Sequence, residues 1–113
     1  ITGGSISNCS ATNGGAIYVA TGGELYIEGG TISNCSASYG GAIYAETNAT
    51  VNISGGTISG CSASNGGAIY TNSGAALSIC TITGCKNSIY SLFFSCFKSY
   101  CLITQTACCK IIV

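Results

Sequence analysis

Residues 32–44 read Ile-Ser-Asn-Cys-Ser-Ala-Ser-Tyr-Gly-Gly-Ala-Ile-Tyr, and closely similar stretches occupy residues 6–18 and 58–70. The three copies are spaced by 26 residues, and a shortened fourth copy covers residues 82–90. A fixed period of this size marks a solenoid, in which each unit buries its apolar face only by stacking on the next unit. The repeat therefore predicts about four stacked coils of ~26 residues.

Short alternations of apolar and polar residues within each repeat predict β-strands. Residues 25–27 (Leu-Tyr-Ile) become Val-Asn-Ile at 51–53 and Leu-Ser-Ile at 77–79, so the outer positions stay aliphatic while the middle one varies. This pattern is typical of an inward–outward–inward strand. By the same reasoning Ile32 points inward between Thr31 and Ser33. We therefore expect an all-β parallel β-helix with three short strands per coil.

Glycine pairs separate these strands and argue against helices. Each pair is expected to supply the positive φ at which the chain bends. In the stretch Gly-Gly-Ala-Ile-Tyr the isoleucine is predicted to point into the core and the tyrosine away from it. Strands in successive coils should then pair about 4.8 Å apart, with identical residues in register.

Composition divides the chain at about residue 90. All 17 glycines lie between Gly3 and Gly84, whereas the three phenylalanines lie beyond them. We interpret residues 1–90 as β-helix repeats and residues 91–113 as an apolar, cysteine-rich tail. The uncharged run of the tail is far shorter than the ~20 residues of a spanning helix. Three interpretations stay open: a cap on the solenoid, a peripheral membrane segment, or an artefact of the gene model. Since the chain opens inside a repeat, we expect it to be a fragment of a longer protein.

The charged residues limit the function classes. Their formal charges cancel, with every acid earlier in the chain than every base: Glu24, Glu28, Glu46, Lys86, Lys98 and Lys110. No basic face is available to bind nucleic acid. Catalysis is not expected either, because glycoside hydrolysis needs a carboxylate pair across the substrate and the chain has no Asp, Arg or His.

One cysteine recurs at the same position of every repeat, giving the ladder Cys9, Cys35, Cys61 and Cys85. The first interpretation is a row of small, buried, free thiols that fills a corner of the core. The second is a set of disulfides between adjacent coils, although stacked side chains that point the same way suit that bond poorly. No metal site or cofactor is expected, because the spacing does not match a zinc motif. The chain has nine cysteines, so at least one is free or pairs elsewhere.

Two outward ladders are candidate binding surfaces. The hydroxyl ladder resembles the Thr-x-Thr arrays of ice-binding β-solenoids, although it also fits a simply solvated strand: Ser5, Ser7, Thr31, Ser33, Thr57, Ser59, Thr81 and Thr83. The tyrosine ladder either stabilises neighbouring strands or forms a platform for sugar rings or a partner protein: Tyr18, Tyr44, Tyr70 and Tyr90.

The three Gly-Gly-Ala-Ile motifs, at residues 14–17, 40–43 and 66–69, resemble the repeats of the chlamydial polymorphic outer membrane proteins. A second motif of that family, Phe-x-x-Asn, is altered here, with isoleucine at the Phe position and cysteine at the Asn position. The resemblance covers roughly residues 3–90. It implies a right-handed β-helix at the cell surface or secreted, continued by further coils of the same chain. It also implies adhesion to a protein or glycan of a host or neighbouring cell.

The sequence leaves more than one function open. The leading hypothesis is a non-enzymatic adhesin passenger or structural stalk. The alternatives are a fragment of a carbohydrate-active β-helix, which binds or cleaves polysaccharide, and an ice-binding solenoid. Four N-glycosylation sequons begin at Asn8, Asn34, Asn48 and Asn52, and they bear on function only in a chain secreted by a eukaryote.

Overall fold

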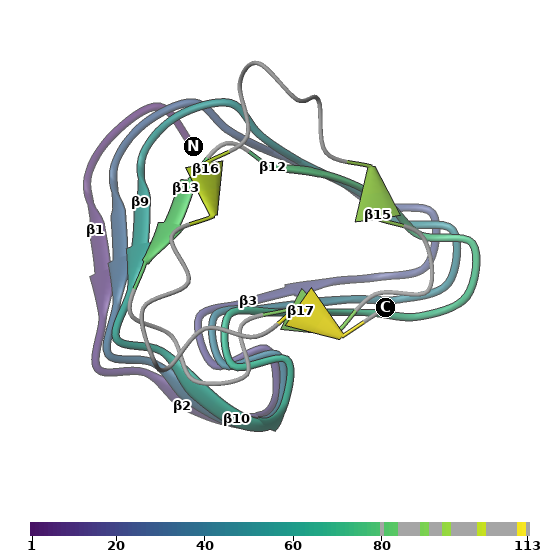
Figure 1. Ribbon diagram of the computed structural model, residues 1–113, viewed down its shortest axis with the longest axis horizontal. Coiled ribbons are helices and arrows are strands. Elements are labelled where there is room, and N and C mark those ends of the chain that lie inside the picture. The colour runs from purple at the N-terminus through teal and green to yellow at the C-terminus, as the bar shows by residue number, and fades with distance from the viewer. Residues whose placement is uncertain (80, 84–88, 91–93, 96–101, 104–110, 113) are drawn as a thin grey trace.

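The computed structural model describes residues 1–79, 81–83, 89–90, 94–95, 102–103 and 111–112, and the described residues form strands and turns without a helix. Figure 1 looks down the stack, and each coil runs down the left side, across the bottom and back along the top. This path is counterclockwise and advances toward the viewer, so the β-helix is right-handed, as parallel crossovers almost always are. The predicted fold class is confirmed.

Four parallel sheets run along the stack. Sheet A contains β1 (Ser5–Ser7), β5 (Thr31–Ser33), β9 (Thr57–Ser59), β13 (Thr81–Thr83) and β16 (Leu102–Ile103). Sheet B contains β2 (Ser10–Asn13), β6 (Ser36–Tyr39) and β10 (Ser62–Asn65). Sheet C contains β3 (Ile17–Val19), β7 (Ile43–Ala45), β11 (Ile69–Thr71), β14 (Ile89–Tyr90) and β17 (Ile111–Ile112). Sheet D contains β4 (Glu24–Ile27), β8 (Thr50–Ile53), β12 (Ala76–Ile79) and β15 (Phe94–Ser95).

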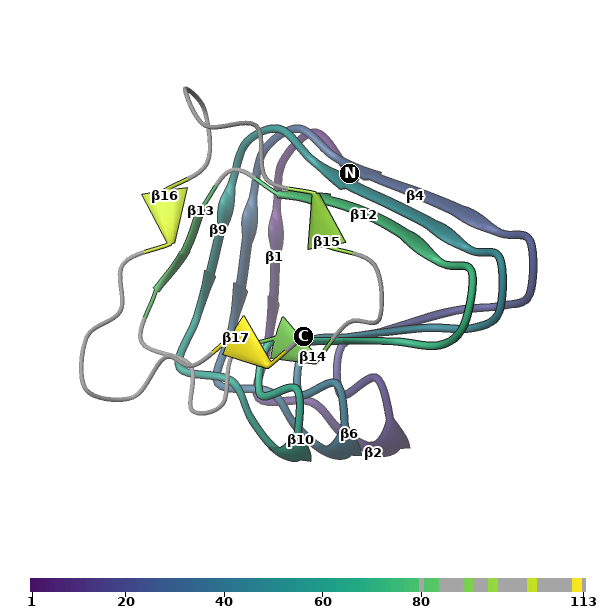
Figure 2. The same ribbon diagram turned by 45° about the vertical axis from the view of Figure 1, so that its right-hand side comes forward.

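The three strands predicted for each coil are those that form sheets A, C and D. Each of the first three coils also contributes a fourth strand, which forms sheet B and which the pattern did not predict. Its strands read Ser-Ala-Thr-Asn, Ser-Ala-Ser-Tyr and Ser-Ala-Ser-Asn, with no aliphatic side chain larger than alanine to mark an inward face. Backbone pairing between stacked coils is enough to form them, because every coil presents the same N–H and C=O groups to the next. Figure 2 shows β2, β6 and β10 as a lobe below the other sheets.

Identical residues meet in register, as expected. Ile6 pairs with Ile32 and Ile32 with Ile58, each 26 residues apart. The shortened fourth copy keeps this register, since Ile82 pairs with Ile58 and Ile89 with Ile69. Its missing residues fall between β12 and β13 and between β13 and β14, where the earlier coils hold turns and sheet B.

Short strands of the tail continue the pairing. Phe94 pairs with Leu77, Ile103 with Ile82 and Ile111 with Ile89. Residues 91–93, 96–101, 104–110 and 113 lie outside the described residues, as does Cys85.

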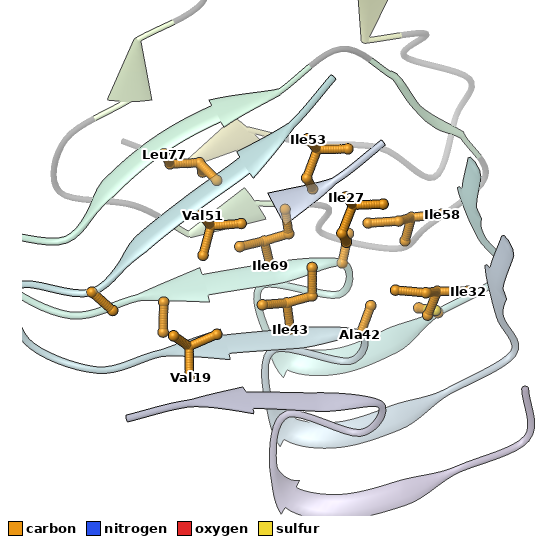
Figure 3. Close-up of a cluster of buried hydrophobic side chains, with 14 of the residues drawn as sticks. Val19, Ile27, Ile32, Ala42, Ile43, Val51, Ile53, Ile58, Ile69 and Leu77 are labelled. Atoms are coloured by element: carbon orange, nitrogen blue, oxygen red, sulfur yellow. The ribbon is translucent and has the colours of Figure 1, made fainter. Parts of the chain in front are cut away.

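The core lies between sheets A, C and D and consists of aliphatic side chains that alternate with outward residues (Figure 3). Ile32, Ile43 and Val51 are buried, each from a different sheet. The predicted inward positions of all three sheets are confirmed, and their burial supplies the main favourable term for stacking the coils.

In the pair Gly40 and Gly41, glycine is required for a different physical reason at each position. Gly40 has a φ of 66°, which only glycine adopts easily, whereas Gly41 has no positive φ. A Cβ on Gly41 would instead overlap the carbonyl oxygen of Gly67 in the next coil. The expectation that each glycine pair supplies a positive φ is confirmed, and one member of each pair supplies it. Asparagine also supplies it, as at Asn34 with a φ of 54°.

Candidate functional site

The tyrosine ladder forms a stack on sheet C. Tyr18 lies over Tyr44 with ring centroids 5.3 Å apart and an interplanar angle of 7°, and Tyr44 lies over Tyr70 at 5.2 Å and 5°. The stack follows from the register, which places the three tyrosines at one position of successive strands. Tyr90 pairs with Tyr70 through the backbone, but its side chain lies outside the described residues.

The rings differ in exposure although their positions in the repeat are equivalent. Tyr18, on the edge strand β3, is 51% exposed, whereas Tyr44 is only 8% exposed because rings cover both of its faces. All three point away from the core, as predicted, but burial of Tyr44 comes from its neighbours in the stack and not from the core. Only part of the ladder is therefore open to a partner.

A carboxylate and an amide clamp the stack. The Tyr18 hydroxyl donates to Glu46 Oε1 at 2.7 Å, and Asn72 Nδ2 donates to Glu46 Oε2 at 3.0 Å and to the Tyr44 hydroxyl at 2.8 Å. Glu46 and Asn72 occupy the same position of successive repeats, two residues after the ladder tyrosine. The network thus joins three coils across one face of the protein.

The network shifts the ionisation of its members. The hydrogen bond from Tyr18, followed by the one from Asn72, lowers the pKa of Glu46 below its ordinary value of 4.5. The same bond to Glu46 raises the pKa of Tyr18 above 10.0. Burial, followed by the nearby Glu46 charge, raises the pKa of Tyr44. Both phenols are therefore held neutral and the carboxylate charged near pH 7.

Stability should depend on pH at both ends of the range. The Glu46 carboxylate contributes fully above pH 4.5, and its contribution is lost as the pH falls through its lower folded pKa. The Tyr18 phenol contributes fully below pH 10.0, and its contribution is lost as the pH rises through its higher folded pKa. We expect Glu46→Gln to move the pKa of Tyr18 back toward 10.0, as measured by NMR of the ring Cζ carbon. Glu24→Gln in the first coil is the control, and an equal change in both variants would contradict the assignment.

Sequence reasoning missed Glu46 and Asn72 as partners of the ladder, and it missed Tyr39. Tyr39 on β6 packs across the stack, with its ring centroid 5.2 Å from that of Tyr70 and the two planes at 71°. Each of the three differs in residue type from the residues at the same repeat position in the neighbouring coils. Those departures were the available signal.

The cysteine ladder lies at the corner between sheets A and B. Cys35 and Cys61 are buried and Cys9 is exposed at the first coil. Each sulfur donates to the carbonyl oxygen two residues earlier in its chain, at 3.4 Å for Cys9, 3.3 Å for Cys35 and 3.5 Å for Cys61. Cys9 and Cys35 are free thiols, so this corner is filled by packing and weak hydrogen bonds.

The hydroxyl ladder lies on sheet A in two rows of unequal exposure. Ser5, Thr31 and Thr57 are exposed and pair in register, whereas Ser33 and Ser59 in the other row are half-buried. Ser7 is exposed, and the side chains of Thr81 and Thr83 lie outside the described residues. Ice binding by these rows stays a prediction.

Comparison with known proteins finds no matching family model, no matching curated protein and no matching solved structure. Among the described residues, no three His, Cys, Asp or Glu side chains gather closely enough to hold a metal ion. That part of the chain also contains no helix with the length and apolarity needed to cross a membrane.

Proposed function

We propose that this chain is a non-enzymatic, surface-exposed or secreted β-helix segment that acts as an adhesin passenger or structural stalk. The observation that carries the proposal is the in-register pairing of each described coil with the next, which produces a stack that lengthens by about 4.8 Å per coil. A stack of this kind projects outward ladders at a fixed spacing, and it needs nothing but further coils to extend. The Gly-Gly-Ala-Ile resemblance to bacterial surface proteins supports the same function.

The tyrosine stack supports adhesion at this surface. Aromatic side chains supply large contact area at low entropic cost, and here their ring orientations are already held by stacking and by the Glu46 network. The partner would be a protein or glycan of a host or neighbouring cell.

Beads coated with the purified chain test the proposal. We expect the beads to bind cultured cells saturably and soluble chain to compete with them. Folded protein that gives no adhesion would reduce the proposal to the stalk. Release of new reducing ends from a panel of polysaccharides would overturn it in favour of a carbohydrate-active enzyme.

A further inference from the structure

One outward row of sheet B breaks the repeat in its middle coil. Asn13, Tyr39 and Asn65 pair in register on β2, β6 and β10, so their side chains project from the same face of the sheet. The first and third coils carry asparagine at this position and the second carries tyrosine. Stacking of identical residues therefore does not explain Tyr39.

Tyr39 is held in place yet remains open to solvent. Its contact with Tyr70 sets the ring at 71° to the stacked rings, while 41% of the residue is still exposed. A ring that is already oriented loses little conformational entropy when a ligand covers it. The flanking Asn13 and Asn65 are half-buried, and each amide offers both a hydrogen-bond donor and an acceptor.

This combination fits a sugar ring. The C–H bonds on one face of a pyranose carry partial positive charge and pack against the negative face of an aromatic ring. Amides about 4.8 Å to either side are placed to exchange hydrogen bonds with the hydroxyl groups at the rim of the sugar. Residues 1–79 contain three glutamates and no lysine or arginine, so the surrounding charge disfavours acidic sugars.

We propose that Tyr39, flanked by Asn13 and Asn65, is a binding site for neutral pyranosides. The inference rests on the proposed adhesive function and names neutral glycan as the ligand class. The pyranose ring lies against Tyr39, and the two amides bind its hydroxyl groups.

The test titrates three defined tetrasaccharides into the intact chain and follows tyrosine ring resonances by NMR. Cellotetraose and chitotetraose are the neutral probes, and tetragalacturonate is the acidic one. We expect saturable shifts at Tyr39 with at least one neutral probe, and binding at least about tenfold weaker for tetragalacturonate. Tyr39→Asn should weaken neutral binding by about tenfold or more, because it removes the ring. Tyr39→Phe keeps the ring and should stay within about threefold of the wild type.

Two features make these variants informative. Tyr39→Asn restores the residue that both neighbouring coils carry at this position, so the variant is expected to fold, and an unchanged circular dichroism melt would verify this. Tyr26→Asn is the matched control, since Tyr26 is 49% exposed on sheet D and pairs in register with Asn52. We expect that control to bind like the wild type.

The inference is overturned if neither neutral probe binds saturably up to about 10 mM, or if Tyr39→Asn binds as tightly as the wild type. Bead adhesion separates this failure from failure of the proposed function. If sugar binding fails while the coated beads still adhere to cells, the adhesive function stands and only the sugar site is removed. Saturable sugar binding without bead adhesion would keep the sugar site and remove the adhesive function.

Discussion

Replacing Gly41 with alanine is expected to destabilise the solenoid by about 3 kcal/mol or more. The added methyl group would overlap Gly67 O and lie 2.6 Å from Ser62 O, and both atoms belong to the backbone of the next coil. The coils cannot separate to admit it without losing inter-coil hydrogen bonds, such as the one from Gly41 N to Gly66 O at 3.0 Å. Steric overlap, and not backbone strain, is the cause, because Gly41 has no positive φ.

Two other glycines are matched controls for Gly41. Gly22 has a φ of 71° with no atom near an added Cβ, so Gly22→Ala should cost only about 1 kcal/mol of backbone strain. Gly3 has neither feature, and Gly3→Ala should stay within about 0.5 kcal/mol of the wild type. Urea unfolding followed by far-UV circular dichroism measures all three. A loss for Gly41→Ala no greater than that for Gly22→Ala would show that close approach of the coils is not the constraint.

Truncating Ile43 to alanine is expected to cost about 2–5 kcal/mol. Ile43 is fully buried on β7 of sheet C, between Ile17 in the preceding coil and Ile69 in the following one. Removing three of its side-chain carbons leaves a cavity that the surrounding coils can close only by giving up their register. The loss should therefore appear as a lower urea midpoint for the whole stack.

Ile17 offers the same side chain at the same repeat position but in the first coil. It is half-buried, because no coil of the described chain covers its other side, so Ile17→Ala should cost about half as much as Ile43→Ala. Ile43→Val should cost about 0.5–1.5 kcal/mol, since it leaves a smaller cavity. Equal losses for Ile17→Ala and Ile43→Ala would mean that burial in the stack does not govern the contribution of this ladder.

Sheets A, C and D could be predicted because each carries an aliphatic residue that must leave water, such as Ile32, Ile43 or Val51. Sheet B could not be predicted from the same pattern. Its central residues are small, like Ala37 and Ala63, so burial contributes little and backbone pairing alone defines the strands.

The tyrosine ladder was likewise visible in the repeat, whereas its polar clamp was not. The Tyr18–Glu46 and Asn72–Tyr44 contacts each join residues 28 positions apart, a separation that corresponds to one coil plus two residues. Nothing in the local sequence pairs them until the coils are stacked. Tyr39 is similar, because its contact with Tyr70 crosses from sheet B to sheet C.

The sequence by itself determined the period, the register and the residues that face the core, because a residue repeated every 26 positions stacks on its own copies. Only the tertiary structure decided how exposed each copy is and which polar groups meet. Tyr18 and Tyr44 both follow Gly-Gly-Ala-Ile, yet one is half exposed and the other buried. The reason is physical: the exposure of a side chain in a solenoid is set by the coils on either side of it and not by its own repeat.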